Sequence, residues 1–174
     1  MKKLLLILLC LPFVFNSCST KKKRISYKQL YKEGDKLFYD GESFTGTAYS
    51  LYNNEDTKLE FEIQFKDGKI NGSAKKWTKG GDIKLEDYFK DGKKNGIQKE
   101  WRGADEGKRY LYSELNYLDD KLHGKSTYWY YGGEKTCTIE NFKFGKKDGV
   151  QKRWNSDGTF DYERNYINGK WIKD

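Results

Sequence analysis

The chain is poor in the residues on which many catalytic and metal sites depend. Its 174 residues include one His, which is His123, and three Cys, which are Cys10, Cys18 and Cys137. So few imidazoles and thiols cannot form a Cys/His cluster for zinc. Asp residues are more numerous, but Asp40, Asp67, Asp91, Asp119 and Asp120 each lie in a turn pattern, where Asp bonds the local backbone, and no segment has the closely alternating oxygens of a calcium loop. We therefore expect no metal and no cofactor.

A nucleophilic pair is also not expected. Cys137 falls in the middle of a strand-like segment, where a small buried hydrophobe is its ordinary role. His123 directly precedes a Gly, a turn position that Asn71, Asn95 and Asp148 occupy elsewhere in the chain. No stretch has the strand, glycine-rich turn and helix order of a phosphate loop, and no nucleic-acid-binding module is present. The sequence predicts no catalytic residues and no enzyme.

The composition is low in apolar residues but rich in aromatic ones. Hydrophobic residues make up 36% of the chain, charged residues 34% and aromatic residues 17%. Low hydrophobicity with high charge can indicate disorder. The aromatic content argues against disorder, because Tyr and Trp bury large areas while a polar edge stays in water. A thin repeat sheet fits these numbers, since it buries less apolar surface than a compact domain.

One motif recurs along most of the chain and is clearest at Phe89–Trp101, which reads aromatic, Asp-Gly turn, Asn-Gly turn and a strand-like run ending in Trp. The aromatic residues that begin the copies are spaced 27, 24, 28, 25 and 24 residues apart; they are Phe38, Phe65, Phe89, Tyr117, Phe142 and Tyr166. A period in this range is typical of a repeat array. Asp-Gly and Asn-Gly supply the positive φ of tight hairpin turns, so each copy is predicted to be a β-hairpin.

Regular alternation along each predicted strand places a row of Trp side chains on one face. The row comprises Leu51, Trp77, Trp101, Trp129 and Trp154, five residues after the second Gly of each copy. The opposite face is expected to be largely solvated. Two interpretations of Trp77, Trp101, Trp129 and Trp154 remain open: a candidate binding surface for a glycan, peptide or protein, or a packing spine between adjacent hairpins. The spine is favoured, because a thin sheet has little else for a core.

The aromatic-x-Asp-Gly-Lys-x-Asn/His-Gly runs resemble the MORN-repeat family, in the divergent bacterial form often labelled YwqK-type antitoxin. The resemblance covers residues 30–174, and Asp40–Gly46 is similar to the opening unit of such arrays. It implies an all-β fold, an elongated single-layer antiparallel sheet of tandem hairpins. Asp120 and Phe144 depart from the Asp-Gly pattern, which leaves these two turns in question. Functions in the family are heterogeneous, so the resemblance implies membrane tethering, scaffolding or protein binding without choosing among them.

Residues 1–17 have the form of an export signal. Two lysines precede an apolar run from Leu4 to Phe15, which has the length of a signal segment and is short for a membrane span. The sequence Phe15-Asn-Ser-Cys18 resembles a bacterial lipobox, which implies that Cys18 is lipidated after cleavage; the alternative is an ordinary secretory signal. Cleavage also removes Lys2 and Lys3, which lowers the net charge from +8 to +6.

Residues 18–29 are predicted to be the lipidated Cys and a basic tether, and residues 30–39 to form a small hairpin that caps the array. The expected location is the cell envelope, lipid-anchored, with Ser19 compatible with the outer membrane. The expected function is a non-catalytic binding or scaffold module whose partners are the membrane, an envelope protein, and a glycan or anionic surface. The alternative is an antitoxin- or immunity-type protein that neutralises a toxin by direct binding.

Overall fold

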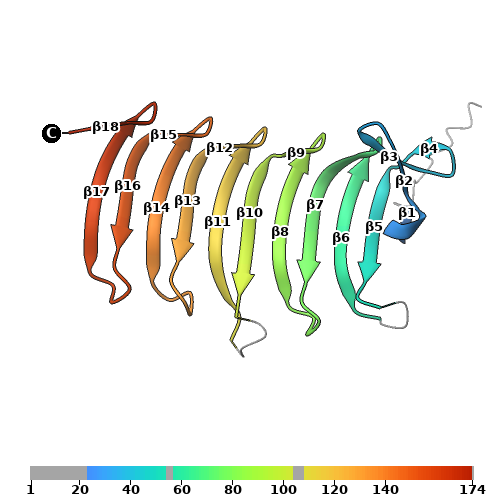
Figure 1. The fold of residues 1–174 in the computed structure, drawn as a ribbon, viewed down its shortest axis with the longest axis horizontal. Helices are drawn as coiled ribbons and strands as arrows, with labels where there is room; N and C mark the ends of the chain where they lie inside the picture. The colour runs from blue at the N-terminus through green and yellow to red at the C-terminus, as the bar shows by residue number, and fades with distance from the viewer. Residues whose placement is uncertain (1–22, 54–56, 104–107, 174) are drawn as a thin grey trace, which may run out of the picture.

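The computed structural model describes residues 23–53, 57–103 and 108–173. It confirms the predicted fold class: the chain is nearly all β, with one long and mostly antiparallel sheet of consecutive hairpins that does not close into a barrel (Figure 1). The strands of the long sheet are β1 (Lys23–Ser26), β5 (Gly46–Leu51), β6 (Leu59–Lys66), β7 (Lys69–Trp77), β8 (Ile83–Lys90), β9 (Lys93–Lys94), β10 (Gly96–Arg102), β11 (Tyr110–Leu118), β12 (Lys121–Leu122), β13 (Gly124–Trp129), β14 (Thr136–Lys143), β15 (Lys146–Lys147), β16 (Gly149–Trp154), β17 (Phe160–Ile167) and β18 (Lys170–Ile172). A second, small sheet contains β2 (Tyr31–Glu33), β3 (Lys36–Tyr39) and β4 (Glu42–Ser43), and a 3-10 helix, η1, spans Tyr27–Gln29.

From β5 onward, the long strands follow one another across the sheet in sequence order, so the array is a simple meander. We call the edge with the two-residue turns the turn edge, and the edge with the longer connections after β5, β7, β10, β13 and β16 the loop edge (Figure 1). The predicted return strands match the structure closely. The segment 83–89, for example, is the body of β8.

All the two-residue turns of the turn edge have positive φ at both central residues, as tight hairpin turns require. Asp91 and Gly92 have φ of 50° and 85°. The two turns left in question keep the same geometry, because Asp120 has φ 65° in a Gly position and Phe144 has φ 48° in an Asp position. The repeat pattern therefore tolerates both departures, although a bulky residue such as Phe is strained at positive φ.

Neighbouring turns are joined along the turn edge by the motif residues themselves. The Gly92 N–H donates to the Ile70 carbonyl at 2.8 Å, and equivalent backbone bonds recur at the turns that follow. The Asn71 amide donates to the Asp91 carboxylate at 3.0 Å, and Asn95 does the same to Asp119 at 3.3 Å. The Asn of the second turn in one repeat thus bonds the Asp of the first turn in the next repeat.

A β-bulge interrupts the pairing of each long hairpin near the loop edge. Lys76 pairs with Leu85 but Trp77 pairs with Ile83, so Lys84 is the extra residue. The same shift occurs at Leu51, Trp101, Trp129 and Trp154. Alternation is kept on the strand that carries the Trp and broken on its partner, which re-aims side chains at the bulge.

The prediction that the face opposite the Trp row is largely solvated is wrong. We call the face with Trp77, Trp101, Trp129 and Trp154 the Trp face, and the other the Tyr face. The most buried positions lie on the Tyr face, two residues after the second Gly in four of the copies: Ala48 is 0% exposed, Gln98 4%, Ser126 0% and Gln151 2%. Part of this burial follows from position, because each of these residues lies only two positions after a glycine, at the start of its strand. The Gln151 amide folds back onto the carbonyls of Gly149 and Asn141, at 3.1 and 2.9 Å, and so closes the irregular start of its strand.

The N-terminal end carries the one cluster of buried apolar side chains found in the described residues. Phe44, Ala48, Phe65 and Ile25 form it. The predicted capping hairpin is present as β2 and β3, which pair antiparallel. The predicted tether, 18–29, is too long at its C-terminal end: residues 23–26 pair in parallel with β5 as β1, and η1 follows. Ile25 explains the difference, because it is 8% exposed and belongs to the core.

Candidate binding site

The Trp row lies in a line across the Trp face, near the loop edge. Each Trp faces a residue of the next strand across the bulge; the pairs are Trp77 with Ile83, Trp101 with Leu111, Trp129 with Thr136, and Trp154 with Phe160. All four indoles are half-buried. Ion pairs border the row toward the middle of the strands, including Lys75 with Glu86 at 2.9 Å and Lys99 with Glu114 at 3.3 Å. Pairing of this kind is what a packing spine requires.

The opposite face holds a groove that the sequence analysis did not identify. It lies near the loop edge, has a volume of about 540 Å³, and is lined by Arg102, Tyr110, Tyr112, Tyr128, Trp129, Tyr130, Tyr131, Cys137 and Thr138. We call it the Tyr groove. Four strands build it, since β10 ends at Arg102, β11 begins at Tyr110, β13 ends at Trp129 and β14 begins at Thr136. Its volume falls within the range of small-molecule sites, roughly 300–1,000 Å³.

Ring contacts fix the walls of the Tyr groove. The rings of Tyr112 and Tyr128 meet edge to face with centroids 6.4 Å apart, and those of Tyr110 and Tyr131 with centroids 5.3 Å apart. The bulge places Tyr112 here, because it is the extra residue between the Glu100–Ser113 and Trp101–Leu111 pairs. Tyr131 is 77% exposed. The groove is therefore bounded by aromatic rings and open to solvent at one rim.

The one charged side chain among the lining residues is that of Arg102. Its guanidinium carbon lies 3.3 Å from the centroid of the Tyr112 ring, so the group covers the ring face. Its Nε donates to the Glu100 carboxylate at 2.9 Å. An Arg held between a ring and a carboxylate keeps further N–H groups to offer, because the guanidinium carries five.

Two lining phenols are perturbed by their surroundings. Burial first, and then the nearby Glu140 carboxylate, raise the pKa of Tyr128 above its usual value of 10.0. The pKa of Tyr130 is also raised, mainly by its hydrogen bond with Cys137. The Tyr130 hydroxyl also donates to the Trp154 carbonyl at 2.8 Å, which ties the groove wall to the next repeat. Both phenols stay neutral at physiological pH.

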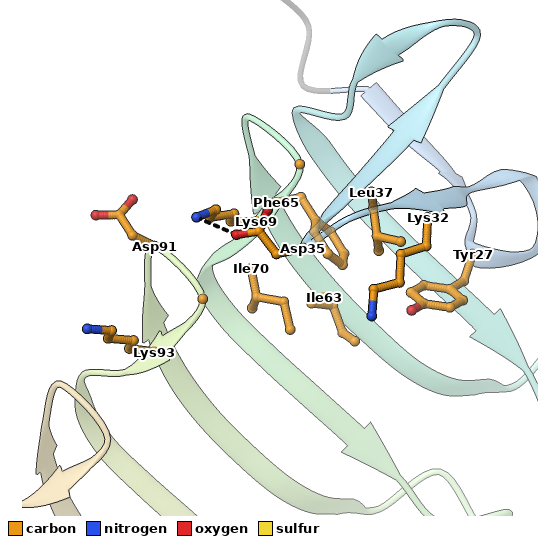
Figure 2. A pocket seen from close by; sticks show the side chains of 12 residues that line it. Tyr27, Lys32, Asp35, Leu37, Ile63, Phe65, Lys69, Ile70, Asp91 and Lys93 are labelled. Carbon is orange, nitrogen blue, oxygen red and sulfur yellow. Dashed lines mark ion pairs between the residues drawn. The ribbon is translucent and has the colours of Figure 1, made fainter.

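A second hollow separates the capping hairpin from the long sheet (Figure 2). It has a volume of about 480 Å³, and Ile63, Phe65 and Ile70 line its apolar side. The Lys69 ammonium crosses its rim to the Asp35 carboxylate at 2.9 Å, as the dashed line in Figure 2 marks. These apolar residues belong to the N-terminal core or pack against it. The hollow therefore belongs to the packing of the capping hairpin, β2 and β3, against the long sheet.

The structure keeps the two residues considered for nucleophilic chemistry apart. His123 lies at the turn edge, before β13, whereas Cys137 lies at the other end of the neighbouring hairpin, one residue into β14. The Cys137 thiol is half-buried and free. No group of three or more His, Cys, Asp or Glu within residues 23–53, 57–103 and 108–173 could hold a metal ion. Cys18 lies outside the described residues.

Two further findings bear on what the chain could be. No helix in the described part of the chain has the length and hydropathy needed to cross a membrane. No protein-family model matches the chain, and no curated protein matches it.

The sequence did contain a signal for the Tyr groove. Five of its 14 Tyr lie at positions 110, 112, 128, 130 and 131, which belong to two adjacent repeats. Strict alternation, however, would pair Tyr112 with Trp101 and place it on the Trp face; the bulge moves it to the face of Tyr128. The regular Trp positions, by contrast, predict a surface on the other face.

Proposed function

We propose that the chain is a membrane-anchored, non-catalytic binding module of the cell envelope. The observation that carries the proposal is the Tyr groove, an open aromatic site held on a sheet whose hairpins are bonded to one another at both edges. Tyr and Arg are the residues on which binding surfaces concentrate their energy. The partner is an envelope protein or polymer.

Rigidity supports this role, because a preorganised site loses little entropy when it binds. The turn edge is tied by backbone bonds such as Asp120 N–H to the Lys94 carbonyl, at 3.0 Å. The loop edge is tied by the hydroxyls of Tyr52 and Tyr130, which donate to the carbonyls of Trp77 and Trp154 in the following repeats. The groove therefore keeps its shape without a bound partner.

The placement of the N-terminus supports an anchor that leaves the groove accessible. Lys23 pairs with Gly46, at the turn-edge end of β5, so the chain enters the sheet from the turn edge. Lys23 follows Cys18 by five positions, a span of at most about 18 Å. The turn edge is rich in lysines, which suit anionic head groups; those next to the turns are Lys66, Lys69, Lys90, Lys93, Lys94, Lys121, Lys143, Lys146, Lys147 and Lys170. The Tyr groove lies near the opposite edge and would face away from the membrane.

A second candidate is an immunity-type protein that binds a toxin directly. The composition of the groove is compatible with a protein partner, because Tyr, Trp and Arg are enriched at the cores of protein interfaces. An envelope location is compatible with such a role, whereas a cytoplasmic antitoxin would conflict with the proposed signal.

Photo-crosslinking in intact cells tests the proposal. A crosslinking phenylalanine analogue is placed at Tyr112 or Tyr128, in the groove, or at Tyr88, which lies on the Trp face and is 42% exposed. We expect a discrete envelope adduct from the groove positions and none from Tyr88. An adduct from Tyr88 alone would move the binding surface to the Trp face. A hydrolytic activity lost in His123→Ala or Cys137→Ala would contradict the non-catalytic role.

A further inference from the structure

We infer that the Tyr groove takes a segment of an uncharged glycan chain. This rests on the proposed function, because it names the ligand of the same groove. The inference comes from four properties of the groove: its aromatic faces, its lack of free charge, the absence of an open backbone edge beside it, and its remaining hydrogen-bonding groups.

Aromatic faces come first. A pyranose ring presents C–H groups on its faces and hydroxyls around its rim, so it packs flat on an aromatic ring while its hydroxyls reach outward. The Tyr groove offers several rings at angles to one another, with Tyr112 and Tyr128 edge to face at 6.4 Å. Such rings bury large apolar area and keep a polar edge available. The exposed ring of Tyr131 extends this surface to the rim.

The charge of the lining selects against ionic ligands. Arg102 is the one charged residue that lines the groove, and Glu100 lies 2.9 Å from its Nε. The phenols are neutral, and burial of Tyr128 disfavours its ionised form. Desolvating an anionic ligand against a paired Arg returns little, because the carboxylate already holds the positive charge. An uncharged ligand avoids this cost.

The backbone beside the groove leaves no place for an added strand. β10, β11, β13 and β14 each have hydrogen-bonded neighbours on both sides in the sheet. An extended peptide binds a sheet best by pairing with an open edge. Laid across this face instead, it would bring unpaired amides against aromatic rings, and each unsatisfied group is costly. A glycan has no such backbone to satisfy.

Hydrogen-bonding capacity remains for sugar hydroxyls. No hydrogen bond joins the phenols of Tyr112 and Tyr128 to any residue that the structure describes. Thr138 and the outer N–H groups of Arg102 also border the space. A phenol both donates and accepts, as a sugar hydroxyl does. A few such groups around an apolar floor are the usual arrangement in a small-molecule site.

The test uses the detergent-solubilised full-length protein and four hexasaccharides: the uncharged maltohexaose, cellohexaose and chitohexaose, and the anionic hexagalacturonate. Binding is measured by calorimetry and, independently, by the rate at which iodoacetamide alkylates Cys137, a free thiol in the groove lining, quantified by peptide mass spectrometry. We expect at least one uncharged hexamer to bind and to slow the alkylation, and hexagalacturonate to do neither.

The variants assign the binding to the groove. Tyr112→Ala and Tyr128→Ala should each weaken binding about tenfold, because each removes a stacking ring. Tyr112→Phe keeps the ring and should lose only a small part of the affinity, which separates stacking from unfolding. Tyr88→Ala, on the other face, should bind as the unaltered protein does.

The inference is overturned if no uncharged hexamer binds, if hexagalacturonate binds equally well, or if the groove variants bind normally. The crosslinking experiment then separates the two proposals. A protein adduct at Tyr112 without glycan binding retains the binding module and removes the glycan. If neither a protein adduct nor glycan binding is found, both the binding module and its glycan ligand are ruled out.

Discussion

The Phe144 N–H donates to Nδ1 of His123 at 3.5 Å, and the two rings lie 4.8 Å apart at 58°. His123 stands in the turn position that Asn71 and Asn95 occupy, and Phe144 stands in the position of Asp91 and Asp119. A His in place of Asn and a Phe in place of Asp, 21 residues apart, thus form a single contact between adjacent turns. The His–Phe pair replaces the Asn–Asp bond that joins the preceding turns.

This relationship predicts that the two residues are energetically coupled. His123→Asn and Phe144→Asp should each break the contact, whereas the double variant should restore an Asn–Asp link. Asp also tolerates the positive φ at position 144 better than Phe does. We expect a coupling energy of about 0.5–1 kcal/mol in a double-mutant cycle, measured by urea unfolding. Strictly additive effects would show that the contact contributes nothing.

The Trp row should contribute to stability, but less than a fully buried row. Trp101→Ala is expected to lower the free energy of unfolding by about 2–3 kcal/mol, below the 3–5 kcal/mol of a completely buried Trp, because the indole is only half-buried. Trp171→Ala on the edge strand β18 is the control; its side chain is 46% exposed, and a loss under about 1 kcal/mol is expected. Equal losses at both positions would contradict the spine.

Gly46 is predicted to control the docking of β1. A Cβ at this position would lie 2.3 Å from the Lys23 carbonyl oxygen, and its φ is +154°. Gly46→Ala should therefore release β1 and speed hydrogen exchange at residues 23–26 by at least about tenfold, which is 1.4 kcal/mol of local opening. Gly92→Ala is the matched control, since its φ is +85° but nothing lies within 4 Å of the added Cβ. It should leave exchange in β1 unchanged.

Asp87 should make stability fall as pH rises from 3.8 toward the raised pKa of its carboxyl. Burial is the main cause that raises the pKa of this carboxyl above its usual value of 3.8; Lys94 opposes the shift and Glu100 adds to it. Between 3.8 and the raised value, the folded chain binds more protons than the unfolded chain, so stability declines with increasing pH.

Asp87→Asn should remove that decline and increase stability at pH 7. Asp157→Asn is the control with the opposite sign, because hydrogen bonds with Thr159 lower the pKa of Asp157 and its contribution is lost as pH falls. Urea unfolding from about pH 2 to pH 7 measures both, because the contribution of Asp157 is lost as pH falls below its usual pKa of 3.8. An unchanged pH profile in Asp87→Asn would contradict the assignment.

The hairpins could be predicted from sequence because their signals are local. Asp67-Gly68 and Asn71-Gly72 specify positive φ where the chain must reverse, and they recur at a nearly constant period. Even Phe144 follows this geometry, because the flanking strands and the preceding turn impose it.

The faces could not be predicted in the same way. Alternation correctly placed Trp101 and its equivalents together, but it led to the wrong prediction that the opposite face is largely solvated. The bulge at each hairpin and the folded-back amide of Gln151 are results of pairing between strands, and they bury short or polar side chains. The Tyr groove depends on the same bulge, which places Tyr112 beside Tyr128, so it required the structure.

The proposed anchor at Cys18 would determine which partners the Tyr groove can meet, and palmitate labelling tests it most directly. Cells producing the unaltered protein or Cys18→Ala are given radiolabelled palmitate and fractionated, with Cys137→Ser as the control for the remaining cysteine of the mature chain. We predict label and membrane association in the unaltered protein and in Cys137→Ser, and neither in Cys18→Ala. An unlabelled protein in the cytosol would contradict the envelope location and favour a cytoplasmic antitoxin.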